Sequence, residues 1–276
     1  MMRSLWTAAS GMRAQQVNVD TIANNVANIN TIGYKSQQAS FKSLLYQNLQ
    51  STSTNNAGEN KPVAAEVGLG SRVAAITSTF TQGNLTHVEN PFSVALEGDG
   101  FFQIRTESGE LQYTRDGSFE ISPVANGNML CTSDGNPVLD AYGNEIILPS
   151  NRVATDLVVN QDGTLAFPDA SGNPAVLTDA NGRPVKFGIY QFNNPAGLSK
   201  EGGNNYSVTV ASGAAVAENG NAAVKQTKTH QYYTEASNVD VANEMVNLIV
   251  AQRAYEMNSK AIQASDEMMQ QANALR

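Results

Sequence analysis

Apolar residues recur at every seventh position near the N-terminus. A second series follows the first by three positions, and the two series are Leu5, Met12, Val19 and Val26, and Ala8, Gln15, Ile22 and Ile29. Seven of these eight residues are apolar, Gln15 being the exception. Steps of three and four residues place side chains on one face of a helix, as in the a and d positions of a heptad repeat. The segment is therefore predicted to be a helix with an apolar seam.

The C-terminal segment repeats this pattern. Its seven-residue series comprises Val241, Leu248, Tyr255, Ile262 and Met269. The partner positions become charged or hydroxylic toward the end and are Met245, Gln252, Ser259 and Asp266. Asp240 or Ser237 is the candidate N-cap, because short polar side chains accept hydrogen bonds from the first free amides of a helix. Each of the two predicted helices would extend roughly 40–50 Å at about 1.5 Å per residue.

The middle of the chain is predicted to be β-rich. All nine prolines lie between Pro62 and Pro195, and no glycine follows Gly220, so the strongest helix breakers avoid both ends. Short alternating apolar runs lie between them, separated by Asp-Gly and Asn-Gly pairs that are typical of hairpin turns. The predicted class is α+β. Terminal helices (residues 1–35 and 238–276) would pair as a coiled coil, with a polar connector (36–68) and an antiparallel β-rich outer domain (69–237).

Further apolar or small residues lie off the predicted seams. They are Trp6, Ala9, Ala23 and Ala27 in the first segment and Ile249, Val250, Ala254, Ala261 and Met268 in the second. One interpretation is an ordinary amphipathic helix packed on the core of its own domain. A pair of helices has only one internal face, however, and each large aliphatic side chain left in water forgoes roughly 1.5–3 kcal/mol of burial. We therefore expect copies of the chain to cover the other faces, and the helical pair to be poorly ordered in the isolated chain.

Charge and composition exclude several functions. The 276 residues include 17 Lys and Arg against 25 Asp and Glu, a net charge of −8, and the basic residues are scattered. Nucleic-acid binding through a basic patch is therefore not expected. The apolar stretches are shorter than the roughly 18–20 residues that cross a bilayer, so no direct membrane insertion is expected. Polar residues soon after Met1 also deny a secretory signal peptide its apolar region.

Candidate catalytic and metal-binding residues are few. His87 and His230 are the only histidines, and the sequence has no HExxH, GxSxG or phosphate-binding glycine motif. Cys131 is the single cysteine, which excludes an intrachain disulfide and a cysteine-based metal cluster. Acidic turns at residues 169–173 and 179–182 lack a complete EF-hand ligand set. No enzyme activity, cofactor or metal site is expected.

Short motifs at both ends and in the middle carry a family resemblance. The N-terminal motifs are residues 1–16 and IANNVAN (22–28), followed by Thr31, Gly33, Tyr34 and Lys35. The others are residues 237–262, QGNL (82–85), GDGFFQI (98–104) and YTRDGSF (113–119). Together they resemble the rod and hook family of the bacterial flagellar basal body, with Val26 and Tyr34 where Leu and Phe are usual. The signature residues carried over are Ala23, Asn24, Asn25, Ala27, Asn28 and Gly33.

Within this family, residues 4–6, 44–47 and 254–260 are most similar to distal rod members, more than to hook, proximal rod or hook-filament junction members. The resemblance implies a structural subunit whose helices form an inner coiled coil and whose copies stack helically into a hollow, rigid driveshaft. Such a shaft carries motor torque to the hook. The implied partners are further copies, other rod and hook proteins, and bushing rings or peptidoglycan. The connector at about residues 47–66 is predicted to become ordered only against adjacent subunits and to stiffen the shaft. Alternatives are a hook or other axial subunit, or a surface-displayed β domain that binds a partner from a coiled-coil stalk.

The resemblance also implies a route and a location. Family members leave the cytoplasm through the flagellar type III export apparatus without a cleaved signal, and lie in the basal body outside the cytoplasmic membrane. Residues 41–45 resemble an aromatic-x-x-x-hydrophobic element recognised at the export gate, with Phe41 and Leu45 as its two recognition residues. The same spacing is also that of a buried pair one turn apart on a helix. An absence of disulfides suits passage of an unfolded chain.

Overall fold

The computed structural model describes residues 2–50, 65–125, 127–150, 152–169, 174–179, 182–221 and 224–274. The chain forms two compact units. The first comprises residues 1–27, 37–78 and 240–276, and the second comprises residues 28–36 and 79–239. Helices occur at both ends and strands between them, so the predicted α+β class is confirmed.

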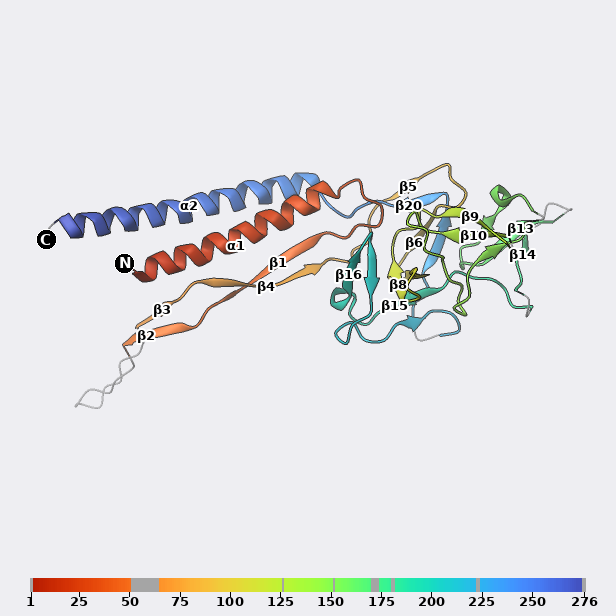
Figure 1. Ribbon diagram of the computed structural model, residues 1–276, viewed down its shortest axis with the longest axis horizontal. Coiled ribbons are helices and arrows are strands. Elements are labelled where there is room, and N and C mark those ends of the chain that lie inside the picture. The colour runs from red at the N-terminus through yellow and green to blue at the C-terminus, as the bar shows by residue number, and fades with distance from the viewer. Residues whose placement is uncertain are drawn as a thin grey trace. The chain divides into compact units, whose positions relative to one another are not determined.

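The first unit contains the two long helices and two pairs of strands (Figure 1). Helix α1 (Met2–Ala27) and helix α2 (Val241–Ala274) lie side by side. On its other side α1 packs against β1 (Gln37–Ser43) and β4 (Ser71–Ser78), which pair antiparallel. Strands β2 (Tyr46–Gln50) and β3 (Ala65–Gly68) continue this ribbon. All of β1, β2 and β3 fall within residues 36–68, the range expected to be a connector, while residues 51–64 of that range lie outside the described residues.

The helix ends follow from local chemistry. Asp240 caps α2, since its Oδ1 accepts hydrogen bonds from the amides of Ala242 (3.0 Å) and Asn243 (3.4 Å). Of the two predicted caps, Asp240 is therefore confirmed, while Ser237 accepts only from the amide of Val239. Helix α1 ends at Ala27, before a run of turns. Ile29, which was predicted to extend the seam, consequently lies beyond the helix.

The second unit is built around a six-stranded sheet. Its spatial order is β16 (Ser199–Gly202), β17 (Asn205–Ser207), β8 (Leu111–Thr114), β7 (Phe101–Arg105), β15 (Ile189–Gln191) and β18 (Val216–Ala217). Each neighbouring pair is antiparallel. The central strand β7 alternates between two cores: Phe101 packs in one cluster with Tyr113, and Phe102 in the other with Phe119. Both faces of this sheet are therefore covered.

Smaller antiparallel sheets complete the second unit. One joins β9 (Glu120–Val124), β10 (Gly127–Cys131) and β11 (Ile147–Leu148), and another joins β12 (Val158–Val159), β13 (Leu165–Pro168) and β14 (Pro174–Val176). Two ribbons pair β6 (Val94–Glu97) with β19 (Lys228–Gln231), and β5 (Leu85–His87) with β20 (Tyr233–Glu235). Short 3-10 turns occupy Ala154–Asp156 and Pro195–Gly197. The predicted antiparallel, hairpin-rich character of this region is confirmed.

Candidate assembly site

Small and polar residues lie in the contact between α1 and α2. Ser4 Oγ lies 3.3 Å from Ser265 Oγ, and Asn25 Nδ2 donates to Glu244 Oε1 at 2.9 Å. Between these pairs, a Cβ added at Gly11 would lie 2.9 Å from Asn258 Nδ2. From one pair to the next, the position on α1 rises by seven and then by fourteen residues, while the position on α2 falls by the same amounts. The two helices therefore run antiparallel. Small residues let the two backbones approach, and hydrogen bonds satisfy the polar groups that this approach buries.

The predicted α2 seam is only partly in this contact. Leu248, Ile262 and Met269 are half-buried, whereas four predicted positions are exposed: Val241, Met245, Gln252 and Tyr255. The second row of the contact is instead Glu244, Ala251, Asn258 and Ser265, one residue before the predicted partner row. Met245 and Gln252 therefore lie outside the α1–α2 contact of the single chain, and their part in assembly stays a prediction. Apolar periodicity selected the more hydrophobic row, while the helix pair uses the smaller and more polar one.

The predicted α1 residues that lie within the helix are all buried or half-buried. Ala8 and Ile22 are buried, and the remaining predicted residues within the helix are half-buried: Leu5, Met12, Gln15, Val19 and Val26. Val19 and Tyr255 line an open groove of about 440 Å³ along α1 and α2, together with Gln16, Gln252 and Glu256. Two residues predicted to be internal thus border a surface that the isolated chain leaves open.

Asn25 shows why part of the N-terminal signature is needed structurally. Its side chain is buried, accepts from the amide of Gln37 and donates to the carbonyl of Gln37, both at 2.8 Å. It thereby ties the start of β1 to α1 as well as α1 to α2. The other signature residues of this stretch differ in burial: Ala23, Asn24 and Ala27 are exposed and Asn28 is half-buried.

An uncovered apolar stripe runs along α2. Its members follow helical steps of four and three residues, and all but Arg253 are apolar: Val246, Val250, Arg253, Met257, Ala261, Ala264 and Met268. All seven are exposed, Met257 to 71%. The stripe lies about 100° around the helix from the α1 contact and extends about 33 Å at 1.5 Å per residue. Val250, Ala261 and Met268 are among the residues expected off the seam. An apolar row this long on a protein surface marks a binding face.

The candidate export element lies in extended structure. Phe41 is in β1 at a register shift of the β1–β4 pair, and Leu45, 82% exposed, follows β1. The alternative interpretation of these residues as a buried pair on a helix is therefore wrong. Their exposure leaves them accessible, but no contact in the structure tests recognition by an export apparatus.

Sequence motifs of the second unit converge on one buried carboxylate that sequence reasoning missed. Glu235 Oε1 accepts from Lys35 Nζ at 2.6 Å and from the amide of Gly83 at 2.8 Å, and Oε2 accepts from Arg115 Nη1 at 3.3 Å. All three charged side chains are at most 2% exposed. Burial lowers the pKa of Lys35, and Glu235 opposes this. Lys35, Gly83 and Arg115 belong to three of the recognised motifs, whereas nothing in the local sequence distinguished Glu235.

Gly33 is required by the backbone next to this triad. Its φ is +69°, a region that side chains disfavour, and an added Cβ would lie 2.8 Å from the amide nitrogen of Asp116. Its own amide donates to the backbone carbonyl of Glu235 at 2.8 Å. The signature glycine therefore permits the N-terminal segment to lie against the motif at residues 113–119 and the backbone of Glu235.

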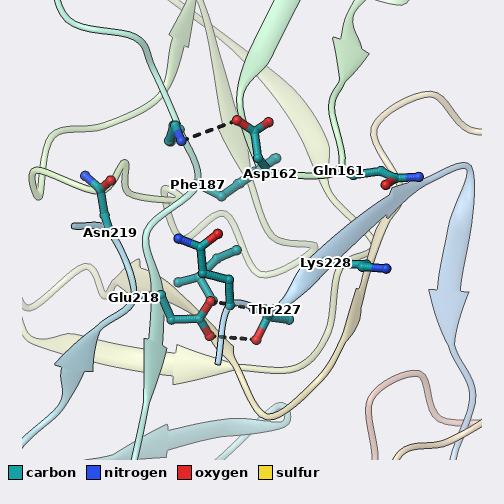
Figure 2. Close-up of a pocket in the computed structure, with 10 residues that line it drawn as sticks. Gln161, Asp162, Phe187, Glu218, Asn219, Thr227 and Lys228 are labelled. Carbon is teal, nitrogen blue, oxygen red and sulfur yellow. Dashed lines mark hydrogen bonds and ion pairs between the residues drawn. The ribbon is translucent and has the colours of Figure 1, made fainter. Parts of the chain in front are cut away.

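The second unit also has a polar pocket of about 260 Å³ (Figure 2). Glu218 lies in its wall and accepts from the amide and hydroxyl of Thr227 and from Gln191 Nε2, at 2.6–2.7 Å. Asp162 pairs with Lys186 at 3.4 Å. The lining of this pocket contains neither histidine nor cysteine among the described residues. Glu218 thus has structural partners within the second unit.

The remaining candidate chemical groups have local partners. Cys131 is buried, its Sγ donates to the carbonyl of Glu120 at 3.5 Å, and burial raises its pKa. His230 Nε2 lies 2.7 Å from Glu97 Oε2, and His87 packs edge-on against Tyr233. Within the described residues, no three His, Cys, Asp or Glu side chains gather in a way that could hold a metal ion. Neither described helix combines the length and hydropathy needed to cross a membrane.

Three family models match the chain. "Flagella basal body rod protein" matches residues 5–35, "Flagellar hook protein FlgE/F/G D1 domain" residues 95–167, and "Flagellar basal body rod FlgEFG protein C-terminal" residues 230–275. Together they cover α2, α1 from Leu5 onward, and the three charged residues of the buried triad, Lys35, Arg115 and Glu235.

Full-length relatives agree with these models. The flagellar basal-body rod protein FlgG of Borreliella burgdorferi is 42% identical and covers 100% of this chain and 99% of the relative. FlgG of Caulobacter vibrioides is 38% identical with 100% coverage of both chains, and FlgG of Bacillus subtilis is 35% identical with 98% coverage of both. The resemblance found in the sequence motifs is confirmed. The chain belongs to the FlgG family of flagellar basal-body rod proteins.

Proposed function

We propose that this chain is a structural subunit of the distal part of the flagellar rod, where copies polymerise helically into a hollow, rigid shaft that transmits torque to the hook. The observation that carries the proposal is the apolar α2 stripe from Val246 to Met268. In an isolated chain these side chains are in water, and contact with further copies would bury them. The coiled-coil packing of α1 and α2 stays a prediction, as does their disorder in dilute solution.

A clamp in the second unit supports the mechanical part of the proposal. Asn238 Oδ1 accepts from the amide of Ser36 at 2.7 Å, and its Nδ2 donates to the carbonyl of Thr79 at 2.8 Å. The amide of Thr79 in turn donates to the carbonyl of Ser36 at 2.8 Å. Ser36, Thr79 and Asn238 each lie at or next to a point where the chain passes between the units. Tying three such segments together limits how far they can separate under load.

The connector would contribute a different mechanical property. Its described ends are β2 and β3, which pair antiparallel and expose Tyr46 and Leu49. We propose that the connector at residues 47–66 is ordered against adjacent subunits and stiffens the shaft. A deletion of its central residues 51–64 should therefore lower the bending stiffness of assembled rods, measured from their thermal curvature in electron micrographs. Unchanged stiffness would contradict this role.

Polymerisation of the purified full chain provides the main test. Wild-type protein should show a concentration threshold above which it sediments as helical polymers. Replacing Val250 and Met257 by Ser should raise that threshold at least tenfold, since about 1.4 kcal/mol corresponds to a factor of ten in an equilibrium constant. The Gln263→Ser variant, at an exposed polar position of the same helix, is the matched control. A fixed small oligomer at every concentration would instead support the display-module alternative.

Location and neighbours require a test in cells. If the chain is a rod subunit, basal bodies from a deletion strain should carry a truncated rod. A complete rod without a hook would assign the chain to the hook instead. Other rod and hook proteins would then be its axial neighbours, with a bushing ring or peptidoglycan outside it.

The export route is a separate part of the proposal. We propose passage through the flagellar type III apparatus, with Phe41 and Leu45 recognised at the gate before the chain folds. Their replacement by Ala should block secretion while leaving synthesis intact, as judged by comparing culture supernatant with cell lysate. Tyr46 and Leu49 replaced by Ala form a matched control of neighbouring exposed side chains. Normal secretion of the Phe41 and Leu45 variant would contradict the assignment.

A further inference from the structure

A second groove, of about 440 Å³, lies between α1 and the strand ribbon of the first unit. Its lining includes Trp6, Arg13, Val17, Leu44, Leu69 and Val73. Trp6 is 75% exposed, although a tryptophan side chain gains more than most from burial. The groove has room for more than one large apolar side chain. None of the motifs that predicted the helices identified this surface.

Close contacts between α1 and the ribbon form the floor of the groove. Gly70 has φ +110°, and an added Cβ would overlap Ser10 Oγ, so the ribbon touches α1 here without a side chain between them. The Ser71 amide donates to Ser10 Oγ at 3.3 Å, and the Leu44 amide donates to the carbonyl of Gly70 at 2.8 Å. The groove is therefore present wherever α1 and the ribbon are folded together.

Two cations border the groove. Arg13 on α1 and Arg72 on β4 are both exposed. Among the described residues, neither guanidinium has a carboxylate within ion-pair distance. An apolar groove with two such cations at its side favours an apolar ridge that carries an acidic side chain.

The α2 stripe offers such a ridge at its C-terminal end. Glu267 is exposed beside Met268 and, over the described part of the chain, has no ion-pair partner. The stripe's other neighbouring acid, Glu256, already pairs with Arg253 at 3.0 Å. Met268 and Glu267 thus combine a flexible apolar side chain with an available negative charge.

The ridge must come from a different molecule. In its own chain α2 contacts α1 through Ser265, on the side of α1 away from the strand ribbon (Figure 1). The stripe of the same chain therefore cannot enter the groove without leaving α1. A second copy can supply it, and because ridge and groove are different surfaces the contact is heterologous. Such contacts propagate as rings or open helical polymers, which agrees with the proposed rod.

We propose that the last turns of α2 from one copy seat Met268 in the groove beside Trp6 of the next copy, with Glu267 between Arg13 and Arg72. This contact deepens the proposed function, on which it rests. Helices commonly bind in this way, with apolar residues one turn apart anchored in a groove.

Charge reversal tests the electrostatic part. Glu267→Arg and Arg72→Glu should each raise the polymerisation threshold of the purified chain about tenfold, the size expected of a coupling near 1.4 kcal/mol. Combining both should return the threshold to within about threefold of wild type. Glu107→Arg, at an exposed glutamate of the second unit, is the control and should leave it unchanged. Far-ultraviolet circular dichroism of the monomers verifies that each variant folds.

The outcomes separate the contact from the function. If wild type and both single variants polymerise at the same threshold, the groove contact is wrong while the rod proposal stands. If the combined variant polymerises no better than the single ones, the charge match is wrong. If wild-type protein never polymerises, the rod proposal itself fails.

A covalent trap tests the contact directly. Trp6→Cys and Met268→Cys are made in separate chains, each also carrying Cys131→Ser, and the two proteins are mixed above the threshold under mild oxidation. A covalent dimer of the two different chains is expected. Leu111→Cys in place of Met268→Cys is the control for random collision. The proposal is overturned if the two mixtures crosslink equally, or if neither of them crosslinks.

Discussion

The buried Glu235 triad allows a quantitative prediction about stability. Glu235→Gln removes the anion between Lys35 and Arg115 but keeps the size of the side chain. Two cations at most 2% exposed would then share a site without their carboxylate. Removing one partner of a buried ion pair generally costs 3–5 kcal/mol, because the remaining charge is left desolvated. We therefore expect the free energy of unfolding to fall by about 3–5 kcal/mol.

A second substitution in the triad should cost less. Lys35→Met leaves Glu235 with Arg115 and the amide of Gly83, so one carboxylate still faces one cation. The main penalty is the carbonyl of Thr81, which loses its 2.8 Å bond from Lys35 Nζ. That carbonyl keeps a longer bond of 3.4 Å from Asn238 Nδ2, so the expected cost is that of one hydrogen bond from a charged donor, about 1.5–3 kcal/mol. Glu235→Gln should therefore cost more than Lys35→Met because it leaves two buried cations without their carboxylate. The number of hydrogen bonds removed does not set this order.

Urea and thermal unfolding of the purified monomer, followed by near-ultraviolet circular dichroism, measure both losses. At roughly 2–4 °C per kcal/mol, Glu235→Gln should lower Tm by about 6–20 °C. Glu145→Gln is the matched control, since its ion pair with Arg105 is about one-third exposed and should contribute less than about 1 kcal/mol. If Glu235→Gln proved as mild as this control, or milder than Lys35→Met, the triad would not be the charge-balanced centre described above.

Three further substitutions test individual contacts by the same unfolding measurements. Gly33→Ala should lose more than about 2 kcal/mol, since it combines a positive φ with overlap on Asp116, whereas Gly109→Ala has the strain without the overlap and should lose less. Asn25→Ala removes three hydrogen bonds from a buried site and should cost about 2–4 kcal/mol, against little change for exposed Asn24→Ala. Burial raises the pKa of Tyr206, so above pH 10 the unfolded chain loses its phenolic proton first and wild-type stability falls. Tyr206→Phe should lessen that alkaline loss; an alkaline profile equal to that of wild type would refute this account of Tyr206.

Much of the architecture could be predicted from the sequence because it depends on local patterns. Proline is confined to the middle and no glycine follows Gly220, so both helices were expected, and Asp240 was one of two expected caps. Alternating apolar runs around strand β7 likewise predicted antiparallel strands. These features depend on neighbours a few residues apart, which a single sequence records directly.

The helix contact could not be predicted in the same way. Heptad analysis places apolar residues inward, but the pair Gly11 and Asn258 meets through small size and an amide. Met245 was placed inside by its hydrophobicity and is 53% exposed. In a subunit of a larger assembly, apolar residues can face other molecules, so hydrophobicity alone does not distinguish an internal contact from an external one.

The buried triad was missed for a different reason. Lys35 and Glu235 are 200 residues apart, and neither has a sequence context that predicts burial. Their motifs identified the family without indicating that they meet. Only the folded β-rich unit brings Gly83 and Arg115 to the same carboxylate.

The 200-residue separation of Lys35 and Glu235 also sets an order of events. A chain delivered with its N-terminus first presents the lysine long before the glutamate, and the intervening segment supplies most of the β-rich unit. Until about six-sevenths of the polypeptide has emerged, that lysine must stay hydrated, since no other carboxylate in the described part of the unit bonds to it. Completion of the second unit therefore waits for the last stretch before α2, which makes premature closure of a partly delivered chain unfavourable.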